Sequence, residues 1–309
     1  MERKVIVIIG PTCSGKTNLG ISIAEKLQTE IISADSRQIY KYLTIGTAKP
    51  GAGLLSKTRH YFIDLLEPDE DFNISKYESD ALQIINHLLD EGKIPVVVGG
   101  SGLYIRALVD GIFNSVDSDE EYREELKDKR EKFGNEYLYE ELKKVDLQSS
   151  EKMLPQNWKR VMRALEVYHL TGQPIWKFQE DYSRKNNCEF IQFGLNWNRQ
   201  VLYANIEKRV DHMIDTGLID EVKNILSKGY SKQLNALNTV GYKEIISFLE
   251  NEFSLERAVE LIKRNTRHYA KRQMTWFRKD KRIQWFDIES VDDLYKVKQT
   301  ILKNFSLTL

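Results

Sequence analysis

The chain has few cysteines, no excess of either charge and no long hydrophobic run. Its 309 residues include only Cys13 and Cys188, too few for a disulfide framework or a four-cysteine zinc site. Lys plus Arg number 46, as do Asp plus Glu, which excludes a uniformly basic coat for nucleic acid but permits a local basic face. The apolar run Val5–Ile9 is far shorter than the ~20 residues that span a bilayer. With an N-terminus that enters a strand-like run at once, these absences predict a soluble, cytoplasmic protein without membrane contact.

The first hundred residues alternate between strand-like and helix-like patterns. Short runs rich in Val and Ile are typical of buried parallel strands, and amphipathic stretches lie between them. Strand–helix–strand alternation implies crossover connections, so the sequence predicts an α/β fold with a doubly wound parallel sheet. The predicted strands are Lys4–Gly10, Glu30–Asp35, His60–Leu66 and Ile94–Gly100, and the predicted helices are Lys16–Gln28 and Ile74–Glu91.

The composition changes after Phe113. Acidic residues outnumber basic ones from Val116 to Met153, and apolar residues there recur at helical spacing. Strand-like character returns at Glu189–Trp197 and at Arg282–Asp287. The C-terminal third is otherwise mostly helix-like, over Arg199–Thr216, Leu218–Lys228, Tyr242–Leu249 and Leu255–Phe277. We therefore expect a core formed by residues 1–114 plus 183–309 and a helical insertion domain over 115–182. The apolar face of the insertion is predicted to hold Leu126, Phe133, Leu138 and Leu142.

One segment matches the phosphate-binding P-loop. Gly10–Thr17 (GPTCSGKT) fits G-x-x-x-x-G-K-[ST] and lies between a predicted strand and a predicted helix. Backbone N–H groups of such a loop turn toward a phosphate, and the helix N-terminus adds partial positive charge. Lys16 is expected to reach the outer phosphoryl oxygens and the Thr17 hydroxyl to hold Mg²⁺. The predicted diphosphate- or nucleotide-binding residues are Gly10, Pro11, Thr12, Cys13, Ser14, Gly15, Lys16 and Thr17.

The carboxylate expected of a nucleotide hydrolase is missing from its usual position. P-loop hydrolases hold Mg²⁺ with an acid at the end of a neighbouring apolar strand, but the fourth predicted strand runs into Gly99–Gly102 (GGSG). A carboxylate stands instead at Asp35, at the end of the second strand. Because parallel strands end at one edge of the sheet, we expect Asp35, the P-loop and Ser101 to meet in one cleft. A structural alternative for Asp35, a helix N-cap, stays open.

Several further blocks follow the P-loop Gly10–Thr17 in order. They are Asp35–Tyr40 (DSRQIY), Ile45–Pro50 (IGTAKP), Gly99–Tyr104 (GGSGLY), Arg160–Glu166 (RVMRALE), Thr171–Pro174 (TGQP), Val240–Tyr242 (VGY) and Lys271–Arg278 (KRQMTWFR). Together the eight blocks resemble the bacterial tRNA dimethylallyltransferases, also called isopentenylpyrophosphate tRNA transferases. The resemblance extends from residue 5 to about residue 287. It implies a P-loop kinase-like core with a helical insertion domain, and by family default a monomer.

The resemblance implies a reaction and its partners. The family transfers the dimethylallyl group of dimethylallyl diphosphate to N6 of the adenosine on the 3′ side of the anticodon, in tRNAs that read codons beginning with U. Diphosphate leaves, and Lys16 with Mg²⁺ at Thr17 would stabilise its charge. Asp35 would act as the general base or hydrogen-bond acceptor for the adenine amine. Arg209 aligns with an arginine on the diphosphate side, although a solvated helix residue is the alternative.

The resemblance also implies a tRNA-binding surface. The block Gln156–Arg160 (QNWKR) departs from the usual Asn-rich form, and the chain lacks the C-terminal zinc finger of many eukaryotic members. The expected tRNA-binding residues are Asp35, Ser36, Arg37, Gln38, Ser101, Arg123, Gln156, Asn157, Trp158, Lys159, Arg160, Gly241, Tyr242, Lys243, Lys271, Arg272, Gln273, Trp276 and Arg278.

The charge pattern near the C-terminus is consistent with such a surface. From Lys263 to Arg282 nine Lys or Arg residues accompany one acid, Asp280, and Trp276 and Phe277 lie within this stretch. Cations suit RNA phosphates and aromatic rings suit unstacked bases. A merely solvated run of charge is the structural alternative.

Two other functions share parts of this pattern. A P-loop nucleoside or nucleotide kinase would use the insertion as a lid, but the acid-rich insertion supplies few of the arginines that such a lid needs. A non-catalytic RNA-binding module would explain the basic stretch but leave the P-loop without a role.

Overall fold

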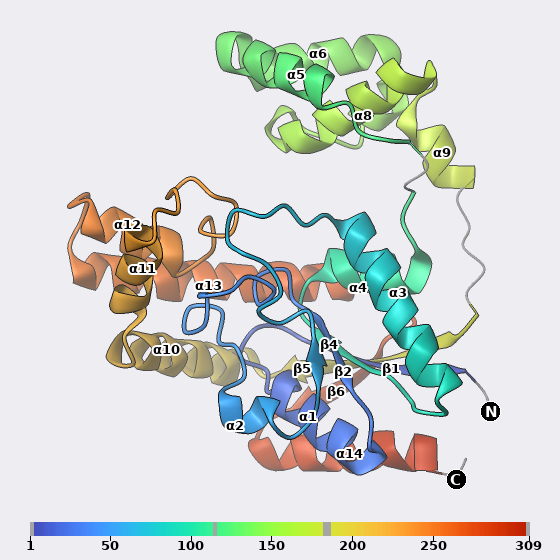
Figure 1. Cartoon of the computed structure of the whole chain (residues 1–309), viewed down its shortest axis with the longest axis vertical. Coiled ribbons are helices and arrows are strands. Elements are labelled where there is room, and N and C mark those ends of the chain that lie inside the picture. Colours follow the sequence, from blue (N-terminus) through green and yellow to red (C-terminus); the bar gives the residue numbers. More distant parts are fainter. Residues whose placement is uncertain (1–2, 114–115, 182–186, 307–309) are drawn as a thin grey trace. The chain divides into compact units, whose positions relative to one another are not determined.

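The computed structural model describes residues 3–113, 116–181 and 187–306 (Figure 1). The predicted insertion bounds at residues 115 and 182 lie outside these residues. Two compact units are present, one formed by Met1–Val109 with Asn186–Leu309 and the other by Asp110–Lys185. No helix among the described residues is long and apolar enough to cross a membrane.

The first unit is built on a six-stranded, all-parallel sheet, which confirms the predicted fold class. The strand order is β3-β2-β4-β1-β5-β6, so the strand that precedes the P-loop is central. Val7 pairs with Val97 on one side and with Gln192 on the other. The strands are β1 (Lys4–Ile9), β2 (Ile31–Ala34), β3 (His60–Tyr61), β4 (Val96–Gly99), β5 (Glu189–Trp197) and β6 (Gln284–Ile288).

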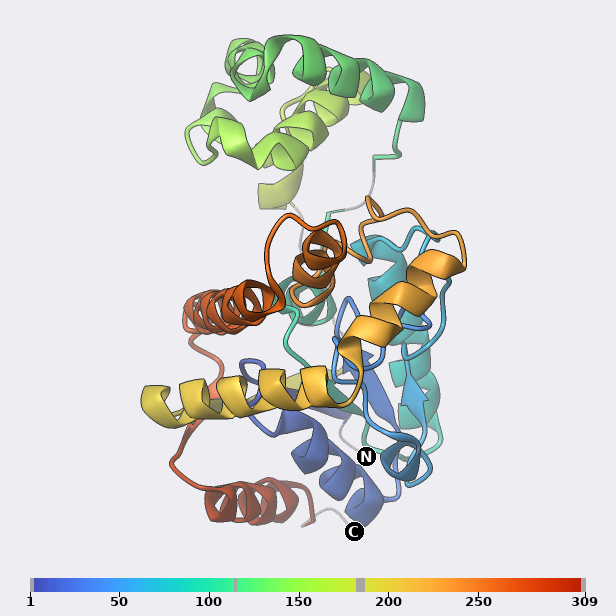
Figure 2. The ribbon, with the colours of Figure 1, turned by 90° about the vertical axis from the view of Figure 1, so that its left-hand side faces the viewer.

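Helices cover both faces of this sheet because its strands are apolar on both sides. In β1, Val5, Val7 and Ile9 belong to one hydrophobic cluster and Ile6 and Ile8 to another, as the two-residue period of a strand requires. The helices of this unit are α1 (Lys16–Leu27), α2 (Ala52–Leu55), α3 (Ile74–Asp90), α4 (Gly102–Asp110), α10 (Arg199–Asp215), α11 (Leu218–Ser227), α12 (Tyr242–Leu249), α13 (Leu255–Phe277) and α14 (Val291–Ser306) (Figures 1 and 2).

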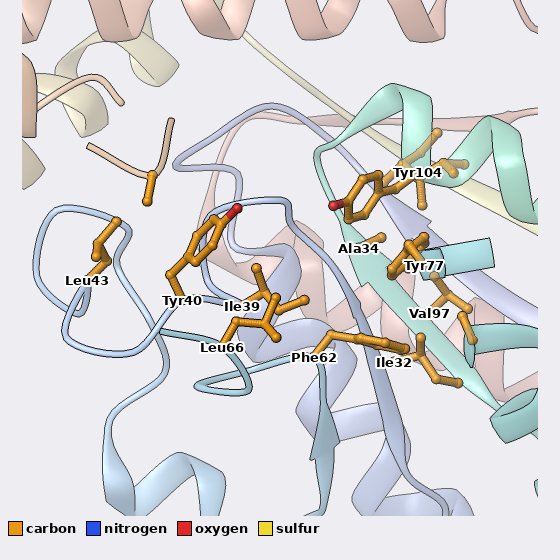
Figure 3. Packing of buried hydrophobic residues seen from close by; sticks show 14 of the residues in the cluster. Ile32, Ala34, Ile39, Tyr40, Leu43, Phe62, Leu66, Tyr77, Val97 and Tyr104 are labelled. Carbon is orange, nitrogen blue, oxygen red and sulfur yellow. The ribbon is translucent and has the colours of Figure 1, made fainter. Parts of the chain in front are cut away.

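Each cluster joins helices that are distant in sequence. Figure 3 shows part of the first, in which the rings of Tyr77 and Tyr104 stack with centroids 4.0 Å apart. In the second, Val297 and Ile301 of α14 pack with residues of α1 beneath the P-loop. Helix α14 is absent from the predicted elements, although its apolar residues recur every four positions. As a result, the P-loop is supported by the sheet and by the packing of α14 against α1.

The second unit is helical and has its own core. Its fully buried Glu166 is bound by Arg123 Nε at 2.7 Å and by Arg163 at 2.6 Å, as a buried carboxylate requires. Phe133 was expected on the apolar face but is 53% exposed, because α5 ends there, and this prediction is wrong. The elements are α5 (Glu120–Phe133), α6 (Asn135–Val145), α7 (Leu147–Ser150), a 3₁₀ turn (Pro155–Asn157), α8 (Trp158–Thr171) and α9 (Ile175–Asp181).

Candidate active site

The P-loop joins β1 to α1 and is shaped to leave its backbone amides facing inward. Cys13 and Gly15 have positive φ angles of 63° and 79°. A Cβ on Gly10 would approach Ser14 Oγ to 2.8 Å, so a larger residue would push into the loop. These angles bring successive N–H groups onto one concave side, which is the geometry of an anion-binding nest. Cys13 therefore occupies a tight turn.

Lys16 lies in this loop with its ammonium group removed from solvent. Its Nζ donates a hydrogen bond to the Pro11 carbonyl at 3.1 Å. Burial lowers the pKa of Lys16 to about 8, although the nearby Asp35 carboxylate opposes the shift. A buried cation without a counterion in contact is costly, and a phosphate would provide one. The residue is therefore suited to an anionic ligand.

A hydrogen bond from β5 also fixes the loop, and one buried polar atom of the loop has no partner among the described residues. Trp197 Nε1, at the end of β5, donates to the Ser14 carbonyl at 2.9 Å. The Ser14 hydroxyl is buried and has no hydrogen-bond partner. Unsatisfied buried polar atoms are uncommon, so this hydroxyl needs a ligand or a water. Ser14 belongs to the same loop as Lys16.

Arg209 of α10 reaches the P-loop from the opposite side of the cleft. Its guanidinium donates to Thr12 Oγ1 at 3.1 Å and contacts Cys13 Sγ at 3.3 Å. The structure therefore places Arg209 beside the loop rather than in open solvent. A second cation beside Lys16 strengthens the positive field that a diphosphate would meet.

Asp35 follows β2 directly and lies in a turn, not at a helix. Its Oδ1 accepts the backbone N–H groups of Arg37 at 2.9 Å and Gln38 at 3.3 Å, which is an Asx-type turn. Within the described residues no group hydrogen-bonds its Oδ2. One oxygen thus stabilises the turn while the other is available to a ligand. The helix N-cap alternative is wrong, because no helix begins at the described residues directly after Asp35.

The loop after β4 meets the Asp35 turn, as the sheet geometry predicts. Ser101 Oγ accepts the Ser36 N–H at 3.0 Å, and the Ser101 N–H donates to the Ala34 carbonyl at 3.1 Å. Arg37 donates to the Asn235 carbonyl at 2.6 Å, and Gln38 donates to carbonyls of the loop 44–48. Several predicted tRNA contacts therefore also hold loops together.

Between the P-loop and α13 lies a cavity of about 350 Å³, which we call the Asp35 cavity. Its polar lining includes Thr12, Asp35 and Arg209. Apolar side chains of α10 and α13, together with Val240, line it as well. The apolar lining consists of Ile206, Val210, Met213, Val240 and Ile262, and the remaining lining residues are Ser36, Arg37, Gly46, Thr47, Asn238, Thr239, Lys243, Thr266, Tyr269 and Arg272.

Gln273 of α13, expected to contact tRNA, is buried beneath this cavity. Its side chain accepts the Thr12 N–H at 2.8 Å and donates to the Gly100 carbonyl at 2.9 Å. It therefore supports the P-loop, and its burial corrects the prediction that it contacts RNA directly. Its neighbour Tyr269 lines the cavity, where burial and the Asp35 charge raise the pKa of its phenol.

Tyr242, a second expected tRNA contact, is fully buried and requires the same correction. Its hydroxyl donates to Glu221 at 2.6 Å, and a Cβ on Gly46 would come within 2.4 Å of its ring. Glu221 also accepts the N–H groups of Thr44, Ile45 and Gly46 at 2.7–3.2 Å. Sequence analysis missed Glu221, whose carboxylate holds the loop that lines the cavity. Gly241, which precedes Tyr242, is also buried.

The basic segment of α13 divides into an inner and an outer side. Trp276 is 41% exposed, whereas Phe277 is 3% exposed in the core, so its expected stacking on a base is wrong. A surface groove runs along the outer side and contains no acidic side chain. The groove is lined by His268, Lys271, Arg272, Thr275, Trp276 and Lys279.

The predicted tRNA contacts Arg123 and Gln156–Arg160 belong to the second unit. Arg123 is bound to Glu166, and the Arg130 guanidinium lies 4.0 Å from the centre of the Trp158 ring. Asn157 accepts the Leu154 N–H at 3.0 Å. The exposed residues of this block are Gln156, Lys159 and Arg160.

Comparison with known proteins gives one consistent family. The model of the IPP transferase family matches residues 38–280. A tRNA dimethylallyltransferase of Acetivibrio thermocellus is 46% identical over 99% of this chain and 97% of its own, and one of Thermoanaerobacter sp. is 43% identical over 98% of both. The structure is similar to that of a full-length tRNA isopentenylpyrophosphate transferase of Bacillus halodurans, with a TM-score of 0.72 and 34% identity over 98% of this chain and 96% of that one. It is also similar to a eukaryotic dimethylallyltransferase acting on tRNA, with a TM-score of 0.78 and 28% identity over 94% of this chain and 75% of that one.

Proposed function

The chain belongs to the IPP transferase family, and we propose from this premise how its site joins a dimethylallyl group to tRNA. It is a prenyltransferase that modifies tRNA. The comparisons favour this activity over a P-loop kinase or a non-catalytic RNA-binding module. The observation that supports our mechanism best is the Asp35 cavity, whose lining combines the P-loop residue Thr12 and a carboxylate with apolar side chains.

The P-loop and two cations bind the diphosphate of dimethylallyl diphosphate. The inward N–H groups of the P-loop and of the N-terminus of α1 donate hydrogen bonds to its oxygens, and Lys16 and Arg209 balance its charge. Ser14 Oγ, unpaired in the free chain, gains an acceptor. As the allylic C–O bond breaks, negative charge grows on the leaving oxygens and these donors stabilise it.

Residues of this loop also fit Mg²⁺. Mg²⁺ keeps several waters and takes phosphate oxygens as ligands, so it needs few protein atoms. The described residues contain no cluster of three His, Cys, Asp or Glu side chains that could hold a metal without substrate. The Thr17 hydroxyl at the start of α1 would be its protein ligand. When bound, the ion adds positive charge against the leaving diphosphate.

The apolar lining and Asp35 serve the two reacting partners. Ile206, Val210 and Met213 offer a surface on which a five-carbon prenyl group loses contact with water. The exocyclic N6 of an adenine, turned out of its stack, attacks the allylic carbon from the Asp35 side. The new C–N bond forms, the C–O electron pair leaves with diphosphate, and the N6 proton passes to Asp35 Oδ2. The target is the adenosine 3′ to the anticodon of tRNAs that read codons beginning with U.

We propose action as a monomer, the state that the resemblance to the family implies. A tRNA substrate also supports a cytoplasmic site of action.

Mass spectrometry of nucleosides tests the proposal. Incubation of the protein with dimethylallyl diphosphate and tRNA should convert adenosine to its N6-dimethylallyl form, with one diphosphate released for each adduct. Omission of Mg²⁺ should slow this conversion. Transfer of labelled phosphate from ATP, or tRNA binding without any adduct, would contradict it.

A further inference from the structure

A second cavity lies on the other side of the P-loop from the Asp35 cavity. We call it the Arg199 cavity; its volume is about 230 Å³. Pro11 lines it, whereas the next residue, Thr12, lines the Asp35 cavity, so the P-loop separates the two. The remaining lining residues are Asn196, Trp197, Arg199, Leu202, Tyr203, Ala270, Lys271, Met274, Thr275 and Arg278.

This cavity concentrates positive charge. Arg199, Lys271 and Arg278 line it, no acidic side chain does, and none of the three forms an ion pair within the described part of the chain. The Arg278 guanidinium donates to the neutral Asn196 side chain, at 3.2 Å. Cavities lined by one sign of charge attract counterions of the other.

The position of Arg199 is unfavourable for the fold alone. It is the first residue of the 17-residue helix α10, where the helix dipole favours acidic side chains and disfavours cations. Its guanidinium lies 5.1 Å from the centre of the Tyr203 ring, which keeps it at the cavity. An anion bound here would relieve both the repulsion among the three cations and the unfavourable dipole.

The surface groove on α13 borders both cavities. Arg272 lines the groove and the Asp35 cavity, while its neighbour Lys271 lines the groove and the Arg199 cavity. Helices α10 and α13 pack together (Figure 2). Residues of both helices line each cavity. A polymer with one residue in the Asp35 cavity could therefore continue along the groove toward Arg199.

We infer that the Arg199 cavity binds backbone phosphates of the tRNA strand next to the target nucleotide. This rests on the proposed function, since the target base must enter the Asp35 cavity. Arg199, Lys271 and Arg278 hold the phosphates, and Tyr203 and Met274 contact the adjoining sugar or base. The contact positions the strand and does not select its sequence.

The salt dependence of RNA binding tests this assignment. Affinity of the full-length chain for an anticodon stem-loop RNA is measured across salt concentrations for the parent, Arg199→Gln, Arg199→Lys and Arg257→Gln. Arg257 is an exposed arginine at the other end of α13, paired with Glu260, and serves as the charge-matched control. We expect Arg199→Gln to lower the log–log slope by ~0.7 and to raise the KM for tRNA more than it lowers kcat. Arg199→Lys should keep the slope, and Arg257→Gln should match the parent.

Three results would overturn the inference. The first is an unchanged slope and KM in Arg199→Gln, and the second is an equal loss of slope in Arg257→Gln. The third is a weaker Kd of Arg199→Gln for dimethylallyl diphosphate with its RNA affinity intact, which would assign the cavity to the diphosphate. Prenyl transfer by the parent is measured in parallel. The salt dependence is measured on RNA binding alone. It therefore tests the assignment of the Arg199 cavity even if the parent transfers no prenyl group.

Discussion

Gln273 accepts a hydrogen bond from the backbone N–H of Thr12 at 2.8 Å, which ties α13 to the P-loop. Its amide nitrogen donates at the same time to the Gly100 carbonyl, and a Cβ on Gly100 would lie 2.3 Å from that nitrogen. The carboxamide is thus satisfied at both ends in a space that only glycine leaves open. It sets the distance between the phosphate-binding loop and the end of β4.

Replacement of Gln273 by Glu should loosen this connection. The carboxylate still accepts from Thr12 but faces the Gly100 carbonyl with no donor, and a buried hydrogen bond lost in this way costs about 1–3 kcal/mol. We expect a lower Tm and a weaker Kd for dimethylallyl diphosphate, measured by calorimetry. Gln299→Glu, on the exposed side of α14, is the control. Equal values in both variants would show that the connection has no effect on the loop.

Lys16→Ala should abolish prenyl transfer while tRNA binding largely survives. Lys16 lies in the diphosphate-binding P-loop, whereas the cations of the Arg199 cavity and of the surface groove lie on α10, on α13 and directly after α13. Single-turnover transfer and RNA binding are measured on the same preparation. Lys26→Ala, an exposed lysine on the same helix, should behave as the parent. If Lys16→Ala lost RNA affinity as severely as activity, this division between the two surfaces would be incorrect.

The lowered pKa of Lys16 predicts a pH dependence of substrate binding. Burial holds this pKa at about 8, so the ammonium is charged below pH 8 and neutral above it in the free protein. Affinity for dimethylallyl diphosphate should therefore fall as pH rises through 8, and binding near pH 8 should take up protons because the diphosphate favours the charged form. For stability the sign is the reverse: the cost of the buried charge is complete below pH 8 and is relieved toward pH 10.5. Calorimetry in buffers of different ionisation enthalpy measures the uptake, which Lys16→Ala should lose.

Asp35→Asn separates the two functions of this side chain. The Asn carbonyl can still accept the amides of Arg37 and Gln38, so Tm and the Kd for tRNA should stay near the parent values. The second oxygen becomes an NH₂ group that accepts no proton, and loss of a general base slows the chemical step by ~10²–10⁴-fold. Single-turnover transfer isolates that step. A rate close to that of the parent would move the proton acceptor to another group or to water.

Glu221→Gln should act at a distance on the Asp35 cavity. One carboxylate accepts three backbone amides and the Tyr242 hydroxyl, and an amide cannot replace all four. We expect a loss of about 1–3 kcal/mol of stability and a raised KM for substrate, since Gly46 and Thr47 line the cavity. Asp220→Asn changes the exposed acid next to it and is the control. Tyr242→Phe should produce a milder form of the same defect, and wild-type kinetics in Glu221→Gln would exclude this role.

The sheet, the P-loop and the position of Asp35 follow from sequence because each depends on residues that are close in the chain. The contacts of Gln273 and Glu221 do not. They join residues 261 and about 176 positions apart, and such side-chain-to-backbone bonds leave no local pattern.

The lack of a local pattern also explains why the tRNA contacts predicted for Gln273 and Tyr242 needed correction. Gln273 adjoins the exposed Arg272, and Tyr242 adjoins the exposed Lys243, so each block contains residues that face opposite ways. A motif identifies the segment, whereas the helical period and the neighbouring elements decide which side chain faces the interior.

The strand order also determines how far the carboxylate stands from the phosphates. The P-loop follows β1, β4 is next to it, and Asp35 follows β2, one strand further out. With neighbouring strands about 4.8 Å apart, an acid after β4 would stand one spacing from the phosphates, close enough to share a metal ion with them. An acid after β2 stands about two spacings away, near 10 Å, which leaves width for an allylic carbon and an attacking nitrogen between acid and phosphate. A shift of one carboxylate by one strand thus separates a hydrolase geometry from an alkyl-transfer geometry on the same sheet.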